Sequence, residues 1–129
     1  MTPLSKGKAQ EYRILYYLRK KGLEAQRIPL SGASQGFQGD ILAPPYLIEV
    51  KRRNKPFNPF LKEWQDFLKR AFESIASKAR SNFIPLVVAS FKGCRVVVCR
   101  YPNENKPFLK FNGLYIQRLE DFDFKRGKR

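Results

Sequence analysis

The amino-acid sequence predicts an α/β fold in which a mixed central β-sheet is flanked by helices. Two segments, 6–21 and 58–80, repeat their apolar residues with the 3.6-residue period of a helix. Between and after them lie short apolar or β-branched runs bounded by glycine and proline, as is typical of strands. The length of 129 residues suits one domain with one core. The expected order of elements is α-β-β-β-α-β-β-β-α.

The first helix is expected over residues 6–21. Ser5 is a candidate N-cap and Gly22 a candidate terminator. Three aliphatic residues mark its buried stripe, namely Ile14, Leu15 and Leu18. Glu11 precedes them by three, four and seven residues, so it lies on the same stripe. A carboxylate there either ends the stripe at water, as acids near helix N-termini often do, or faces a site at the edge of the core.

A short edge strand is expected at residues 24–30, because Pro29 cannot donate to a neighbouring strand. The loop 31–39 contains three glycines and no acid. A hairpin follows, with the apolar runs Ile41–Leu42 and Tyr46–Val50 separated by a proline pair.

The second helix is expected to start at Asn58-Pro59, with Asn58 as the cap, and to run to about residue 80. Its apolar residues spread over about half of the helix circumference. They are Phe60, Trp64, Phe67, Leu68, Ala71, Phe72 and Ile75. Two explanations remain open for so wide a face: contact with a partner subunit, or deep burial in its own domain.

A second hairpin is expected from Ile84–Phe91 and Cys94–Tyr101, joined at Lys92-Gly93. The rest is expected to be a loop at 102–107, a strand at 108–116 that can turn at Asn112-Gly113, a short helix at 118–122 and a basic tail at 125–129. Cys94 and Cys99 are five residues apart on one strand and so face opposite sides. Both are therefore interpreted as buried apolar residues rather than a disulfide.

The charge and the missing histidine restrict the function. The formal net charge is +15, with 26 basic and 11 acidic residues, which predicts a polyanionic partner such as nucleic acid. Because the chain has no histidine, it has no His-based zinc site and no Ser-His nucleophile. An enzyme built on it must use carboxylates, lysine and a hard cation such as Mg²⁺. No membrane-spanning run or secretory signal is seen, so we expect an intracellular protein.

The most informative segment is GDILAPPYLIEVK, residues 39–51. Glu49 and Lys51 are two apart on a predicted strand and so share a face, while Asp40 opens the partner strand. An acid two residues from a lysine on a strand is more often a solvated ion pair. The apolar neighbours and the glycine-containing loop before Asp40 favour a metal-dependent site for phosphodiester chemistry instead.

Taken in order, these pieces resemble the PD-(D/E)XK nuclease superfamily and, more narrowly, the archaeal-type Holliday-junction resolvases called Hjc. The matching pieces are Gly7 to Glu11, Arg27 with Ser31-Gly32, Asp40, and Ile48-Glu49-Val50-Lys51. The resemblance is specific over residues 7–53 and looser beyond. A phage-encoded member is the origin that it suggests. Three departures are Gly39 in place of the proline of the motif, Tyr12 where many resolvases have arginine (Arg13 follows one place later), and the Pro44-Pro45 turn.

The resemblance implies a restriction-endonuclease-like core and a role for each site residue. Asp40 and Glu49 would bind one or two Mg²⁺ ions, which Mn²⁺ could replace, with help from the Val50 carbonyl and Glu11. Lys51 would orient or deprotonate the attacking water. Ser31, or else Ser34, would flank the scissile phosphate. The residues expected to contact DNA are Arg13, Arg27, Ser34, Arg52, Arg53 and Lys55.

The implied function is a structure-specific endodeoxyribonuclease that resolves four-way DNA junctions by paired symmetric cuts, acting as a homodimer. The apolar face of the second helix and the strand after Pro107 are the two candidate dimer surfaces. One alternative is another small nuclease of the same superfamily that cuts nicked, branched or linear DNA. An alternative from a different class is a basic DNA-binding protein without catalytic activity.

Overall fold

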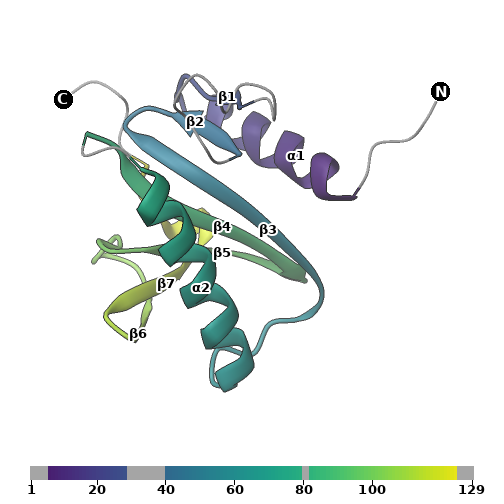
Figure 1. Cartoon of the computed structure of the whole chain (residues 1–129), viewed down its shortest axis with the longest axis vertical. Helices are drawn as coiled ribbons and strands as arrows, with labels where there is room; N and C mark the ends of the chain where they lie inside the picture. Colours follow the sequence, from purple (N-terminus) through teal and green to yellow (C-terminus); the bar gives the residue numbers. More distant parts are fainter. Residues whose placement is uncertain (1–5, 29–39, 80–81, 125–129) are drawn as a thin grey trace.

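A seven-stranded mixed sheet with the strand order β1-β2-β3-β4-β5-β7-β6 forms the centre of the molecule (Figure 1). The structure is a computed structural model, and it describes residues 6–28, 40–79 and 82–124. The elements, in order, are α1 (Lys6–Lys20), β1 (Gln26–Arg27), β2 (Ile41–Ala43), β3 (Tyr46–Pro56), α2 (Lys62–Lys78), β4 (Ile84–Lys92), β5 (Cys94–Cys99), β6 (Leu109–Phe111), β7 (Leu114–Arg118) and the 3-10 helix η2 (Leu119–Asp121). The predicted α/β fold with a mixed sheet is confirmed.

The two helices cover opposite faces of the sheet (Figure 1). On one face, Ile14 and Leu18 of α1 pack with Ile48 of β3. On the other face, Leu68 and Phe72 of α2 pack with the strand side chains that alternate with those of the first cluster. Side chains that alternate along a strand therefore enter different cores, and β3 contributes to both. We call these the α1 face and the α2 face.

The end of α1 follows the predicted chemistry. Gly22 has a φ of +94°, a left-handed conformation that glycine adopts without strain. The N–H groups of Gly22 and Leu23 donate to the carbonyls of Arg19 and Leu18, which closes the helix in a Schellman arrangement. Ser5, the candidate N-cap, lies outside the described residues.

The start of the second helix was predicted three residues too early. The Asn58 side chain does accept a hydrogen bond, from the Phe60 N–H at 3.0 Å, but it stabilises a turn that precedes the helix. The helical bonds begin only after Leu61, which has no side-chain cap. An Asx turn and a helix N-cap use the same local bond, so the sequence could not separate them.

The wide apolar face of α2 is explained by burial within the domain. Five of its residues are buried against the sheet, namely Trp64, Leu68, Ala71, Phe72 and Ile75. Phe60 lies outside the helix and is 80% exposed. Most of this face is therefore not free to bind a partner, which removes the main support for it as a dimer surface.

The C-terminal segment forms one strand more than the predicted order contains. The stretch 108–116 turns at Asn112 and Gly113, whose φ angles are 48° and 79°, and so gives both β6 and β7. The short helix predicted at 118–122 is the 3-10 helix η2. Cys99 is buried on the α1 face, whereas Cys94 is only half-buried, on the α2 face.

The edge strand β1 is shorter in the described residues than the predicted 24–30, and Pro29 and Leu30 lie outside them. Strand β3 is longer than predicted, because the basic run 51–55 continues it as far as Pro56. The tail at 125–129 is also outside the described part. No helix in the described ranges is long and apolar enough to cross a membrane.

Candidate active site

The candidate site lies where β3 continues beyond the end of its partner β2. The antiparallel register pairs Ile41 with Ile48 and Ala43 with Tyr46, so the Pro44-Pro45 pair makes a two-residue turn. Asp40 immediately precedes β2, at the end of this ladder, where β3 continues to Glu49. The backbone of Asp40 is fixed on both sides, since its N–H donates to the Ile48 carbonyl and its carbonyl accepts from the Ile28 N–H, each at 3.0 Å.

The Asp40 side chain is held by the backbone of β3. Its Oδ2 atom accepts a hydrogen bond of 2.7 Å from the Val50 N–H. Because the carbonyl of Ile48 and the N–H of Val50 both bond to Asp40, they point to the same edge of β3. The N–H and C=O of one strand residue point the same way, so the Val50 carbonyl is also directed to this edge.

Glu49 and Lys51 lie together on the α2 face. The Lys51 Nζ is 3.4 Å from the Glu49 Oε2, and the two side chains are 37% and 14% exposed. Val50, between them, packs against the core on the α1 face. The arrangement is one half-buried carboxylate with a lysine beside it that still reaches solvent.

The acids are close enough to affect one another. Burial is the largest cause that raises the pKa of Asp40, to about 6, and the hydrogen bond from Val50 opposes it. The negative charges of Glu49 and Glu11 raise this pKa further, while Lys51 lowers it. A bound cation would remove the repulsion that these charges create, so the site favours one.

Glu11 is held by an ion pair with Arg27. The Arg27 Nε and Nη2 atoms are each 3.0 Å from the Glu11 Oε1. Tyr12 also contacts Arg27, accepting a 3.3 Å bond from its Nη1. Glu11 acts on Asp40 through its charge, and no group of three or more acidic or thiol side chains in the described ranges is arranged to hold a metal ion.

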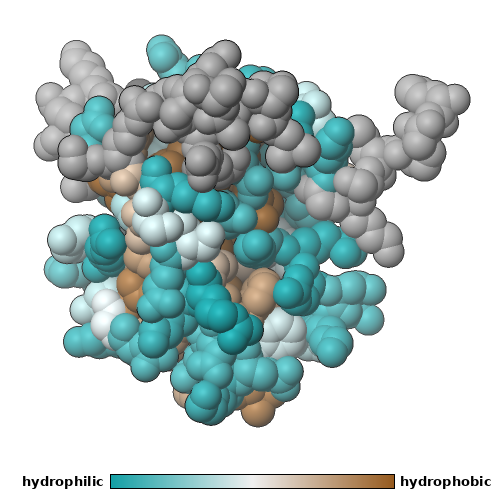
Figure 2. Space-filling view, in the orientation of Figure 1, coloured by the Kyte–Doolittle hydropathy of each residue, from teal (hydrophilic) through white to brown (hydrophobic). Residues whose placement is uncertain are grey.

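The residues predicted to contact DNA differ in how far their side chains are exposed. Arg13, Arg53 and Lys55 are exposed, and Arg52 is half-buried. The Arg53 guanidinium lies 4.1 Å from the centre of the Phe67 ring on α2 and donates to the Arg52 carbonyl. In Figure 2, hydrophilic residues cover most of the described surface on the side where α2 lies. Ser31 and Ser34 lie outside the described residues.

The donor set fits a hard divalent cation. Asp40, Glu49 and the Val50 carbonyl all offer oxygen, and Mg²⁺ is commonly bound by one or two carboxylates with water and substrate phosphate completing its shell. The bond from Val50 to Asp40 was not predicted, although the hairpin register could have indicated it. Tyr12, treated in the sequence only as a departure, also belongs to the site's surroundings because it holds Arg27.

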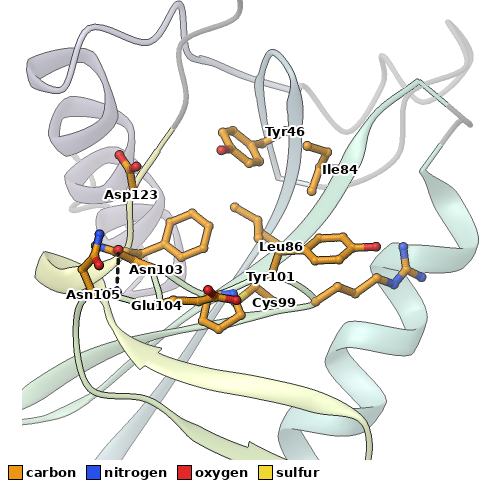
Figure 3. A pocket seen from close by; sticks show the side chains of 12 residues that line it. Tyr46, Ile84, Leu86, Cys99, Tyr101, Asn103, Glu104, Asn105 and Asp123 are labelled. Atoms are coloured by element: carbon orange, nitrogen blue, oxygen red, sulfur yellow. Dashed lines mark hydrogen bonds between the residues drawn. The ribbon is translucent and has the colours of Figure 1, made fainter.

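A pocket of about 390 Å³ lies away from these residues, at the end of the sheet where β3 and β4 begin (Figure 3). Tyr46, Ile84 and Tyr101 line it, and a loop through Asn103 forms its rim (Figure 3). The Asn103 N–H donates to the Gln117 side chain, and Asn103 Nδ2 donates to the Asp121 carbonyl, which holds the loop in place. None of Asp40, Glu49 and Lys51 lines this pocket, so it is not the candidate site.

No family model and no curated protein matches the sequence. Among solved structures, the chain is similar to Hjc of Archaeoglobus fulgidus, a Holliday junction resolvase from an archaeal hyperthermophile. The two share 18% identity over 87% of this chain and 86% of that chain, with a TM-score of 0.41. The likeness concerns the arrangement of the chain, and the function of this protein has to be inferred from its own residues.

Proposed function

We propose that this protein is a Mg²⁺-dependent endodeoxyribonuclease. The observation that supports it most directly is the group of Asp40, Glu49 and Lys51 at the open edge of β3, where the pKa of Asp40 is raised to about 6 by burial and nearby negative charge. Crowded carboxylates next to a lysine suit the binding of a cation and of a phosphodiester. The formal charge of +15 suits a nucleic-acid substrate.

Asp40, Glu49 and the Val50 carbonyl would hold the cation. When bound, Mg²⁺ supplies Lewis-acid polarisation of a phosphate oxygen and lowers the pKa of bound water. The Val50 N–H occupies Oδ2 of Asp40, so Oδ1 is the atom of that carboxylate left for a ligand role. The backbone bonds on both sides of Asp40 keep the carboxylate in place before any ligand arrives.

Lys51 would act on the reacting phosphate. Its ammonium is held near Glu49 at 3.4 Å yet is 37% exposed, so it can turn towards an incoming polyanion. There it would orient the attacking water and stabilise the negative charge that develops on the phosphorane oxygens. Glu11, fixed by Arg27, would tune the site through its charge.

The proposed substrate is branched DNA, with the four-way junction as the specific form, and the proposed assembly is a homodimer. Paired cuts on symmetric strands need two sites, and one chain of this size offers one. Of the two surfaces considered, strand β6 is supported better. It is one of the two edges of the sheet, its Leu109 and the adjoining Phe108 are exposed, and an apolar groove of about 310 Å³ lies beside them.

A paired cleavage assay tests the proposal. The protein is incubated with a four-way junction and with a linear duplex of the same sequences, each with Mg²⁺ or with EDTA. Cutting of the junction in Mg²⁺ alone supports the resolvase. Equal cutting of both substrates supports another small nuclease, and binding without cutting in either case supports the DNA-binding protein without catalytic activity.

A further inference from the structure

A polar pocket lies on the α1 face, at the end of the sheet where β4 finishes. Its volume is about 580 Å³. It is formed by α1, by the β4–β5 turn and by the start of η2, with Gln10, Ser90, Arg95 and Arg118 among its lining residues. We call it the Ser90 pocket. It shares no residue with the candidate active site.

Strand register places two arginines on either side of Ser90. Arg52 of β3 is the register partner of Ser90 in β4, and Arg95 of β5 is its partner on the other side. Val50, Val88 and Val97 occupy the preceding row on the α1 face. Because side chains alternate, Arg52, Ser90 and Arg95 form the next row on that same face. Arg95 lines the pocket, whereas Arg52 does not. Neighbouring strands are about 4.8 Å apart, so the long Arg52 side chain starts one strand from Ser90 and can reach it.

Two buried polar atoms in this pocket have no hydrogen-bond partner in the described structure, the Oε1 of Gln10 and the Oγ of Ser90. Gln10 is 7% exposed and Ser90 is 5% exposed. A buried polar atom without a partner destabilises the fold, so a partner from outside the chain, water or a ligand, is expected. Both atoms belong to residues that line the same pocket.

Two arginines and one acid line the pocket, namely Arg95, Arg118 and Glu120. Within the described ranges, neither Arg52 nor Arg95 has an acidic side chain at ion-pair distance. Arg118 is different, since it is 3.1 Å from Asp121 and 3.9 Å from Glu120. Its charge is therefore already balanced, and Arg52 and Arg95 are the guanidinium groups left for a ligand.

We propose that the Ser90 pocket binds a phosphate group, with Arg95 and Arg52 as the charged contacts and the Ser90 hydroxyl as a hydrogen-bond donor. Guanidinium and hydroxyl groups are suited to phosphate oxygens. Gln10 contributes a donor once its amide is turned so that Nε2 faces the pocket, because the two ends of an amide exchange by a half-turn. An apolar ligand would leave Ser90 and Gln10 unpaired, and a cation would meet two positive charges.

The phosphate can belong to the DNA backbone or to a free small molecule. The DNA source rests on the proposed function, and it would deepen that function. Glu49 and Lys51 point to the α2 face of β3 and Arg52 to the α1 face. A backbone phosphate in the Ser90 pocket would therefore be a different one from the phosphate being cut, and the pocket would help to orient the DNA.

The test is an NMR titration of the full chain labelled with ¹⁵N, in EDTA so that nothing is cut. One sample receives inorganic phosphate at constant ionic strength, and another receives a four-way junction. The signals followed are the Gln10 side-chain amide, the Ser90 backbone amide and the Arg95 Nε–H. The variants are Ser90→Ala and Arg95→Gln, with Lys78→Gln as a control that removes one exposed positive charge at the end of α2, outside the pocket.

We expect saturable shifts of all three signals. Arg95→Gln should weaken the binding about tenfold, since one charge-assisted contact is lost, and Lys78→Gln should change it by less than about twofold. Shifts with inorganic phosphate and DNA alike assign a general phosphate site, whereas shifts with DNA alone assign a backbone phosphate. Ser90→Ala removes a buried unpaired hydroxyl, so the variant is expected to fold, which its unfolding curve will show.

The proposal is overturned if neither titrant moves the Gln10 and Ser90 signals, or if both variants bind as the wild type does, because the pocket then holds water alone. Its failure is separable from failure of the nuclease. A protein that cuts DNA in Mg²⁺ while these signals stay unchanged loses only the Ser90 pocket. A protein that shows the shifts with inorganic phosphate but cuts no DNA loses only the nuclease proposal.

Discussion

The carboxylate of Asp40 and the backbone N–H of Val50 are joined by a hydrogen bond of 2.7 Å across the hairpin. The bond reaches one residue past Glu49, so the side chains of Asp40 and Glu49 are brought to the same stretch of β3. The donor is the chain's own backbone, and the bond orients the carboxylate. The cost of this arrangement is that a partly buried acid carries its charge close to Glu49 and Glu11, which raises its pKa to about 6.

Replacing Asp40 by Asn should stabilise the metal-free protein at neutral pH. The pKa of Asp40 is raised on folding from 3.8 to about 6, so the folded state holds the proton more tightly than the unfolded state. The resulting stability is fully present below pH 3.8 and is lost as the pH rises through about 6. Asp40→Asn avoids the ionisation and can still accept the Val50 bond, so we expect a gain of about 1–3 kcal/mol at pH 7.

Urea unfolding in EDTA at pH 4, 5, 6 and 7 measures this difference, which should grow with pH. Saturating Mg²⁺ should stabilise the wild type and leave Asp40→Asn unchanged, since a ligand stabilises only the state that binds it. A variant that is less stable than the wild type at pH 7 in EDTA would show that the charge of Asp40 does not destabilise the folded protein.

Replacing Lys51 by Met should separate binding from cutting. The ammonium lies 3.4 Å from Glu49, on the face where the phosphate is proposed to react. Loss of a group that stabilises developing charge typically costs about 100- to 1000-fold in rate. Single-turnover cleavage in Mg²⁺ measures this, with Lys62→Met on α2 as a control that also removes a lysine paired with an acid. A cutting rate within a few-fold of the wild type would remove Lys51 from the mechanism.

Replacing Glu11 by Gln should lower the pKa of Asp40. The negative charge of Glu11 is one of the causes that raise this pKa, and the amide can still accept the bond from Arg27. An NMR titration of the Asp40 side-chain carboxyl measures the pKa, and Glu63→Gln on α2 is the matched control. An unchanged or higher Asp40 pKa would mean that the two acids do not interact.

Replacing Leu109 by Lys should produce a monomer. Leu109 is exposed on β6, the last strand of the sheet, beside an apolar groove. A charge on such an edge opposes pairing with a second chain. Sedimentation should show a dimer for the wild type and for the control Tyr101→Lys, which changes an exposed aromatic residue away from β6. A wild-type monomer at micromolar concentration, with uncoupled single nicks on a junction, would contradict the proposed dimer.

Much of the secondary structure could be predicted because it depends on residues close together in the sequence. The periodicity of α1, its end at Gly22 and the Asn112-Gly113 turn depend on neighbouring residues, and the structure agrees with them. The predicted start of α2 was wrong because the Asn58 hydrogen bond is equally suited to a turn. The predicted length of β3 was too short because its basic residues are poor strand formers by themselves. Pairing with β4 keeps them extended.

Relationships that span several strands could not be read from the sequence. The ion pair of Arg27 with Glu11 joins β1 to α1, and no pattern in the sequence indicates that Arg27 is occupied there. The row of Arg52, Ser90 and Arg95 depends on two separate registers, one parallel and one antiparallel. That Glu49 and Lys51 point to the same face, by contrast, follows from the alternation of side chains along one strand.

The central claim is that Asp40 and Glu49 bind the metal that cuts DNA, and cleavage of a four-way junction by Asp40→Asn and Glu49→Gln tests it most directly. Both variants should bind the junction at least as tightly as the wild type, because each removes a negative charge that faces phosphate, and neither should cut it in Mg²⁺. The control Glu63→Gln removes an exposed acid of α2 and should cut normally. If either site variant cuts at close to the wild-type rate, these carboxylates are not the metal ligands and the proposed function fails.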